Sequence, residues 1–155
     1  SRARFAVVPP ASMADDLEGW KSLARRLQAP LQTTRMAVAG EISSTPVLIA
    51  TEWAQDEVPT HTTVRVDFRD PIGDKHRLAW APTTGLRRGD LGQIAPAARA
   101  RWAPLCDGAL AVDVERELLT VALPAPAPDP LALYARAESA LAFYGALIAG
   151  QGPYR

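Results

Sequence analysis

The hydrophobic pattern is most regular in residues 60–68, THTTVRVDF, where the two sets of alternate side chains differ in polarity. A repeat of two residues places these sets on opposite faces of a strand, and the many β-branched residues also favour a strand. Since a single strand is not stable in water, we expect paired neighbours and an apolar layer over one face. The two faces would carry Thr60, Thr62, Val64, Val66 and Phe68 on one side and His61, Thr63, Arg65 and Asp67 on the other.

Shorter or weaker alternation predicts further strands at residues 33–42, 76–80, 110–115 and 119–123. The last two of these segments, joined by Arg116 and Glu117, are typical of a β-hairpin. Residues 45–53 differ because both alternate sets are apolar, with Leu48 and Ala50 on the second face. This pattern indicates a central strand, or a strand whose second face meets a partner.

Apolar side chains at intervals of three and four residues predict three helices. The first begins at Ser12 and ends before Pro30. The second spans roughly residues 95–106, with Pro96 in its first turn and Gly108 just past its end. The third begins at Pro130, after Asp129 as its cap, and follows a proline-rich crossover.

The predicted order is α-β-β-β-(β)-α-β-β-α. Segregated strands with short connections form antiparallel sheets. We therefore predict an α+β fold with an antiparallel sheet of five to six strands and three helices packed mainly on one face. Residues 1–155 are expected to form a single domain, with residues 1–11 as an N-terminal arm and residues 150–155 as a C-terminal tail.

This element order resembles that of the small homodimeric chaperones of type III secretion. The resemblance rests on element order and chain length, and no sequence motif carries it. It implies a chaperone-like binding role and a homodimer.

The charge balance limits the class of partner. Seventeen basic and seventeen acidic side chains cancel, which argues against general adhesion to nucleic acid or to anionic membranes. A net charge of zero also leaves little repulsion between copies of the chain. The longest apolar stretch, around residues 140–149, is shorter than the ~20 residues that a bilayer crossing needs. We expect a protein partner or a second copy, with no nucleic acid and no membrane insertion within this chain.

Cys106 is the only cysteine, so no disulfide can form within the chain. This fits a reducing compartment, and we expect a cytoplasmic location. The chain begins at Ser1 rather than at Met, which is also compatible with a piece of a longer, anchored protein.

Two residue types that often act as nucleophiles occur without a catalytic context. Cys106 lies at a predicted helix end on the apolar side, where a thiol is a small buried hydrophobe and the helix dipole disfavours a thiolate. Ser43 and Ser44 lie in a predicted turn and lack the GxSxG frame of serine hydrolases. We therefore predict no catalytic residue and no enzyme.

The two histidines, His61 and His76, could ligate a metal together with Glu52, Asp56 or Glu57. No HxH, HxxxH or HExxH spacing supports this hypothesis. We predict neither a metal site nor a cofactor.

The segment GLRRGDLG, residues 85–92, precedes a predicted helix. An anion could bind against Arg87, Arg88 and the helix amides. The segment matches neither phosphate-binding loop motif, and its Gly, Pro and Thr content is typical of a surface loop over residues 82–92. Anion binding at Arg87 and Arg88 is one interpretation of this segment, and a solvated surface loop is the other.

Four tryptophans could line a pocket or anchor an interface. We expect Trp20 and Trp102 in the core, and Trp53 and Trp80, near strand ends, as the exposed pair. Together with the second face of residues 45–53, this predicts an interface at Leu48, Ala50, Trp53 and Trp80.

The favoured hypothesis is a non-enzymatic protein-binding or assembly module, homodimeric in one version, that uses the sheet and the edges near Trp53 and Trp80. The alternative is a small-molecule-binding or enzymatic domain. Its pocket would lie between sheet and helices, with His61, Arg65 and Asp67 as polar lining.

Overall fold

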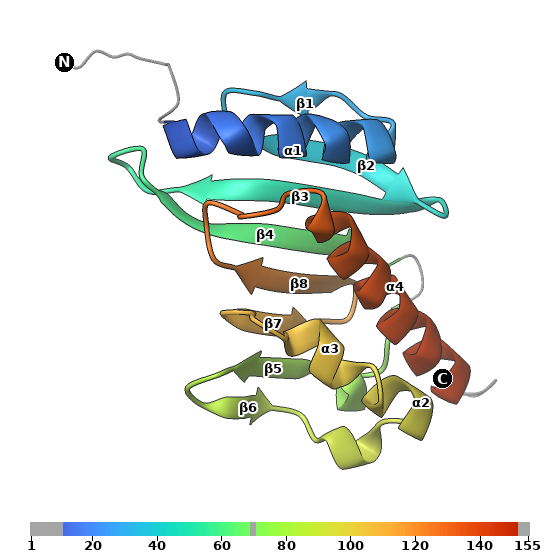
Figure 1. The fold of residues 1–155 in the computed structure, drawn as a ribbon. Helices are drawn as coiled ribbons and strands as arrows, with labels where there is room; N and C mark the ends of the chain where they lie inside the picture. The colour runs from blue at the N-terminus through green and yellow to red at the C-terminus, as the bar shows by residue number, and fades with distance from the viewer. Residues whose placement is uncertain (1–10, 69–70, 152–155) are drawn as a thin grey trace.

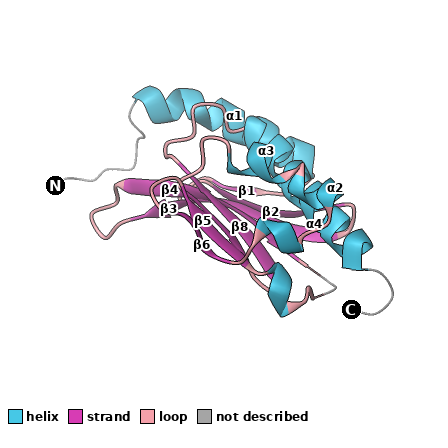
Figure 2. Ribbon diagram, turned by 90° about the horizontal axis from the view of Figure 1, so that it is seen from below, coloured by secondary structure: helices cyan, strands magenta, loops and turns pink. Residues whose placement is uncertain are grey.

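The computed structural model describes residues 11–68 and 71–151. Within these ranges the chain forms an eight-stranded antiparallel sheet with α-helices on one side (Figures 1 and 2). The elements are α1 (Ala11–Leu27), β1 (Leu31–Gln32), β2 (Ala37–Ile42), β3 (Thr45–Trp53), β4 (Pro59–Asp67), the 3₁₀-helix η2 (Asp74–His76), β5 (Leu78–Ala81), β6 (Gly85–Arg88), the 3₁₀-helix η3 (Leu91–Gln93), α2 (Pro96–Arg99), α3 (Trp102–Cys106), β7 (Ala111–Val114), β8 (Leu118–Leu123) and α4 (Ala132–Gln151).

The sheet has the strand order β1-β2-β3-β4-β8-β7-β5-β6, and each pair of neighbours is antiparallel. The most regular segment of the sequence is β4, which pairs with β3 on one side and β8 on the other. The hairpin β7–β8 lies between β4 and β5, so the chain crosses two strand positions after β4 and fills them later (Figure 1). The α+β class, the antiparallel sheet and the central place of this strand are confirmed.

The predicted number of strands was wrong, because the sheet in the described residues has eight. One additional strand, β1, is only two residues long and pairs Leu31 with Val38. Such a short strand shows no period. The other, β6, lies in the segment predicted as a surface loop, where Trp80 pairs with Leu86 in a hairpin. The glycines and arginines of that segment conceal its strand character.

The predicted second helix is two short helices, α2 and α3, separated by Ala100 and Arg101. Pro104 explains the break. It has no N–H to donate to the carbonyl of Ala100, and its ring would clash with that carbonyl in a continuous helix. Pro96 lies at the start of α2, and Gly108 follows α3 with a left-handed φ of +71°. Both of these predicted helix signals are confirmed.

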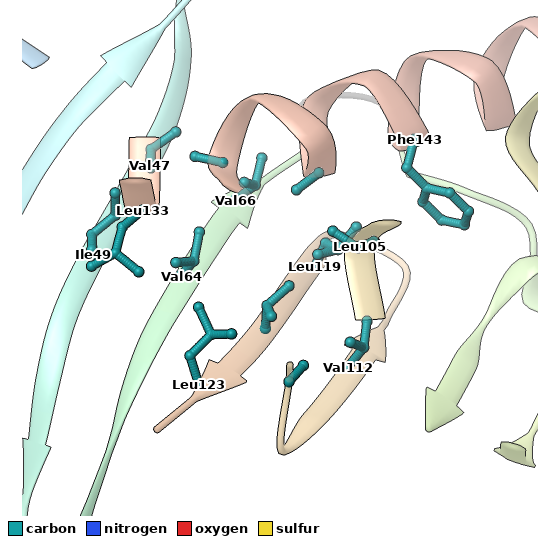
Figure 3. Packing of buried hydrophobic residues seen from close by; sticks show 14 of the residues in the cluster. Val47, Ile49, Val64, Val66, Leu105, Val112, Leu119, Leu123, Leu133 and Phe143 are labelled. Atoms are coloured by element: carbon teal, nitrogen blue, oxygen red, sulfur yellow. The ribbon is translucent and has the colours of Figure 1, made fainter. Parts of the chain in front are cut away.

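The helix-facing side of the sheet forms the core. In register across five strands, Val38, Ile49, Val64, Val121 and Val112 make one row in which every side chain is fully buried. A second buried row contains Val47, Val66, Leu119, Val114 and Leu78. Figure 3 shows several of these side chains gathered between the sheet and α4. The prediction that one face of residues 60–68 is buried is therefore confirmed.

α4 is the central element of the helical layer, since it contacts β4 as well as α1, α2 and α3. Fully buried Ala137 and Ala140 allow it to approach the sheet closely, and Phe143 packs against Trp102 with ring centroids 5.4 Å apart. α1 covers β2, where Gly40 lets the backbone approach Leu27; a Cβ at residue 40 would lie 3.3 Å from the Leu27 Cβ. The helices thus pack on one face, as predicted.

The predicted arm and tail lie outside the described residues, apart from Ala11 at the start of α1 and Gly150 and Gln151 in α4. The turn predicted at residues 70–74 lies partly outside them as well. No helix in the described ranges combines the length and the hydropathy required to cross a bilayer.

We predict that Gly89→Ala destabilises the fold by about 2–5 kcal/mol. Gly89 has φ +88°, and a Cβ there would collide with the Arg77 carbonyl oxygen and the Leu78 side chain. Gly85→Ala is the matched control, because Gly85 has φ +66° and open space around a Cβ. It should cost only the backbone strain, about 1–2 kcal/mol. Urea unfolding of both variants measures the difference, and equal losses would contradict the packing of the β5–β6 hairpin.

Candidate functional site

One face of the sheet carries no α-helix among the described residues, because α1 to α4 lie on the other side (Figure 2). We call this the outer face. Small side chains form its middle, in a single row across five strands: Ala37, Ala50, Thr63, Ala122 and Ala111. A row of small side chains leaves the surface low between the larger residues around it. Ala37, Ala50 and Thr63 are at most 9% exposed, so the accessible surface of this face lies at half-buried Ala111 and Ala122 and at the larger side chains beside the row.

A hollow of about 380 Å³ opens on the outer face over β2, β3 and β4. It combines apolar side chains with three charged ones. The lining residues are Ala39, Gly40, Glu41, Pro46, Val47, Leu48, Arg65 and Asp67. We call it the outer-face hollow.

The charges of the outer-face hollow are only loosely paired. The Arg65 Nε and the Asp67 Oδ1 are 3.6 Å apart, and the two side chains remain 43% and 45% exposed. This separation is too long for a hydrogen bond. Neither atom has a hydrogen-bond partner among the described residues, although both atoms are buried. Glu41 is exposed and has no ion pair in the described part of the chain. These charges can therefore rearrange to meet a partner.

The four residues of the predicted interface do not form one surface. Leu48 lines the outer-face hollow and Ala50 lies beside it in the row of small residues. Trp80 is in register with buried Val112 and so lies on the helix side. Trp53 is partly buried against the core, and its Nε1 donates to the Arg35 carbonyl oxygen at 3.0 Å. The structure thus brings Leu48 and Ala50 together and separates both tryptophans from them.

The remaining tryptophans lie where the sequence predicts. Trp20 and Trp102 are only 2% and 6% exposed. Trp53 and Trp80 are half-buried rather than fully exposed.

The alternative hypothesis placed His61, Arg65 and Asp67 in a pocket between the sheet and the helices, and this placement was wrong. Arg65 and Asp67 line the outer-face hollow, and His61 shares their face by alternation along β4. None of the three lies between the sheet and the helices. The reason is the alternation itself, which turns Thr62, Val64 and Val66 towards the helices and the polar set away from them.

A second hollow, of about 320 Å³, does lie between the sheet and the helices. It opens where the end of β8, the proline-rich crossover, the end of α3 and the start of α4 meet. Its lining is Gly108, Leu123, Pro124, Ala127, Pro128, Asp129, Ala132, Leu133 and Arg136. We call it the crossover cavity.

Sequence reasoning missed Arg136, which lines the crossover cavity. Its Nη1 donates to the carbonyl oxygens of Leu105 at 2.8 Å and Pro104 at 3.3 Å, near the end of α3. The only available signal was its position between Leu133 and Ala137, the apolar residues at the inner side of the helix. A charged side chain there borders the core instead of pointing directly into water.

Arg88 of the predicted anion site already has an acidic partner. Its Nη1 is 2.6 Å from Glu115 Oε2, while Arg77 holds Oε1 through Nε at 3.1 Å and Nη2 at 2.6 Å. One amide near this segment, the Gly92 N–H in η3, donates to the Asp90 side chain at 2.8 Å. Arg87 and Arg88 belong to the edge strand β6, and anion binding there stays a prediction.

The residues considered for catalysis and metal binding lie apart. Ser43 and Ser44, with φ of 51° and 67°, form the tight turn between β2 and β3. Within the described ranges, no three His, Cys, Asp or Glu side chains are grouped to hold a metal ion. Cys106 is 8% exposed. Its burial raises the thiol pKa from 9.0 to about 12, although the Arg136 charge acts in the opposite direction.

The sequence matches no protein-family model, and no curated protein sequence is significantly similar to it. Among solved structures, the fold is similar to the crystal structure of the mycobacterial trehalose monomycolate transport factor A, TtfA. The superposition has a TM-score of 0.51 at 18% sequence identity and covers 90% of this chain and 96% of the other. At this identity the likeness shows a similar fold. The chaperone-like, homodimeric role implied by element order stays a prediction.

We predict that Cys106 resists thiol reagents at pH 8 while the chain is folded, because the reactive form is the thiolate. Its pKa is about 12 in the folded state against the ordinary 9.0. The unfolded chain therefore loses the thiol proton first as the pH rises. Above pH 9 this favours unfolding by roughly 1.4 kcal/mol per pH unit.

Two measurements check this prediction. Colour development with a disulfide reagent at pH 8 should follow global unfolding by urea. The stability difference between wild type and Cys106→Ala should be constant below pH 9 and should shift in favour of the alanine variant between pH 9 and 10.5. Rapid labelling of the folded protein would show an accessible, ionisable thiol instead.

Proposed function

We propose that this chain is a non-enzymatic binding module that docks another protein on its outer face. The observation that carries the proposal is the one-sided arrangement of the helices, which leaves the outer-face hollow and its row of small residues uncovered by any described helix. Half-buried Leu48, Ala111 and Ala122 offer apolar contacts on this face. Uncovered sheet faces of mixed apolar and charged character are suited to protein recognition.

The face is a better docking surface than the edges of the sheet. β1 is two residues long, and β6 carries Arg87 and Arg88. Short edge strands and basic side chains both discourage the addition of a further strand. This argument replaces the version of the hypothesis that uses the edges near Trp53 and Trp80.

The charges of the outer-face hollow favour a partner with a basic side chain. Glu41 and Asp67 contribute two negative charges, and Arg65 contributes one positive charge that is already shared with Asp67. The lining thus has a net charge of −1. A partner lysine or arginine could lay its aliphatic stem on Pro46 and Leu48 while its cation meets Glu41.

A binding role agrees with the chemistry of the remaining candidates. The raised pKa of Cys106 opposes nucleophilic attack at neutral pH. The structural neighbour is named as a transport factor; this describes that protein, and its similar fold is compatible with a binding role here. The partner, the absence of enzymatic activity and a cytoplasmic location remain parts of the proposal.

We test the proposal with a benzophenone amino acid placed at position 48 or, as the control position, at position 131. Leu131 is 44% exposed and directly precedes α4 on the helix side. After irradiation in an extract of the source cells, position 48 should give a discrete protein adduct and position 131 should not. An adduct with the mass of two chains would identify a second copy as the partner.

A charge reversal in the hollow should weaken this adduct. We expect Glu41→Lys to reduce it about fivefold or more, because a fivefold change corresponds to about 1 kcal/mol. Glu138→Lys makes the same charge change at an exposed position of α4 and should have no effect. Equal labelling from positions 48 and 131, or an adduct that is insensitive to Glu41→Lys, would refute docking on the outer face. Circular dichroism checks that both variants remain folded.

A further inference from the structure

The crossover cavity has features of a ligand site that is separate from the outer face. Its volume of about 320 Å³ lies at the lower end of the range for small-molecule pockets, about 300–1,000 Å³. Its floor is formed by core residues, since Leu123, Ala127 and Leu133 are all buried. A ligand in the cavity would therefore replace water on an apolar surface that continues into the core.

The walls explain why the cavity stays open. Gly108 has no side chain, Ala127 and Ala132 have only a methyl group, and the rings of Pro124 and Pro128 are short and rigid. None of these side chains can swing into the space. Most of the wall is consequently small or rigid, and the lining side chains that can change rotamer are Leu123, Asp129, Leu133 and Arg136.

Arg136 contributes a cation that is held in place but only partly used. Its Nη1 is fixed by the carbonyl oxygens of Pro104 and Leu105. No hydrogen bond joins its Nε or Nη2 to another residue in the described part of the chain. These two atoms form the edge of a guanidinium that binds a carboxylate with two parallel hydrogen bonds. Elsewhere in the molecule the same edge of Arg77 contacts a carboxylate, where Nε and Nη2 both donate to Glu115 Oε1.

Asp129 adds a condition on the charge of the ligand. It lines the same cavity, is exposed and takes part in no ion pair among the described residues. Because the cavity carries one positive and one negative side chain, a ligand with a single negative charge beside Arg136 is favoured over a ligand with two.

We propose that the crossover cavity binds a small aliphatic monocarboxylate, with its chain on Leu123, Ala127 and Leu133 and its carboxylate on the Nε–Nη2 edge of Arg136. The ligand class follows from an apolar floor, a fixed guanidinium with a free bidentate edge and a volume suited to a short or medium chain. This site is distinct from the proposed protein-docking face, so each proposal can fail without the other.

The test is a titration of the ¹⁵N-labelled chain with sodium decanoate below its micelle concentration. We expect saturable shifts of amide signals around Ala127 and Leu133. Decanol and decyltrimethylammonium have the same alkyl chain and lack the carboxylate. Both should bind at least about tenfold more weakly than decanoate, as expected for loss of a charge-assisted bidentate contact. Decyl phosphate adds a second negative charge and should also bind more weakly than decanoate.

A matched pair of substitutions locates the site. Ala132→Phe fills the cavity from an exposed lining position and should abolish the shifts. Ala135→Phe, which is exposed on the same helix and does not line the cavity, should leave them intact. Arg136→Lys keeps the positive charge but removes the pair of parallel donors. It should weaken the binding of decanoate about fivefold and leave the affinity for decanol unchanged.

Three outcomes would overturn the proposal: shifts that do not saturate, decanoate binding that survives Ala132→Phe, or equal affinity for decanoate and decanol. If Arg136→Lys does not fold because α3 loses its contact, the comparison of the two alanine substitutions still decides the location. The comparison of decanoate with decanol still decides the role of the charge.

Discussion

Burial of one face of the sheet under the helical layer centred on α4 is the contact on which the rest of the structure depends. Two rows of fully or almost fully buried aliphatic side chains run across the strands beneath the helical layer, in which α4 covers β4, α1 covers β2 and α3 contacts β7. Each such side chain contributes about 1.5–3 kcal/mol when it leaves water. The helical layer is organised around the same helix, because α1, α2 and α3 all contact α4. With strand pairing alone, both faces of the sheet would be exposed to solvent. The register of the strands would then be only weakly specified.

Both proposed sites follow from this one-sided burial. With the helices on one side, the polar set of β4 and the small residues beside it remain on the outer face. The chain must also return from the end of β8 to the start of α4 across the edge of the core. It does so through a segment of alternate prolines, whose rigid rings cannot close over the apolar floor. The outer-face hollow and the crossover cavity are therefore places where the core packing ends, one on each side of the sheet.

The sequence allowed prediction of the features that depend on a repeating pattern. The strand at residues 60–68, the one-sided helices and the burial of Trp20 all follow from period-two or helical spacing. β1 is too short to have a period, and β6 owes its conformation to pairing with β5 rather than to its own residues. The orientation of Trp80 depends on its register with Val112, which alternation within β5 alone does not set. Only Leu48 and Ala50 of the predicted interface reach the outer face, since these lie in the one segment whose second face is itself apolar.

The arginines show why composition gave so little information on sites. Arg77 gives Glu115 two hydrogen bonds and Arg88 gives it one, of 2.6–3.1 Å, so both oxygens of this carboxylate are paired and β6 is joined to the residues flanking β5 and β7. Arg65 makes only a 3.6 Å contact with Asp67. Arg136 donates hydrogen bonds from one nitrogen, Nη1, to two carbonyl oxygens of α3. All of these side chains are guanidinium groups on ordinary elements, and no motif distinguishes them. What separates Arg77 and Arg88 from Arg136 is the chemistry of the partner: a carboxylate balances the charge of the first two, whereas Arg136 contacts neutral carbonyl groups among the described residues. Such pairing is a property of tertiary geometry that the chain does not reveal until its strands and helices are in place.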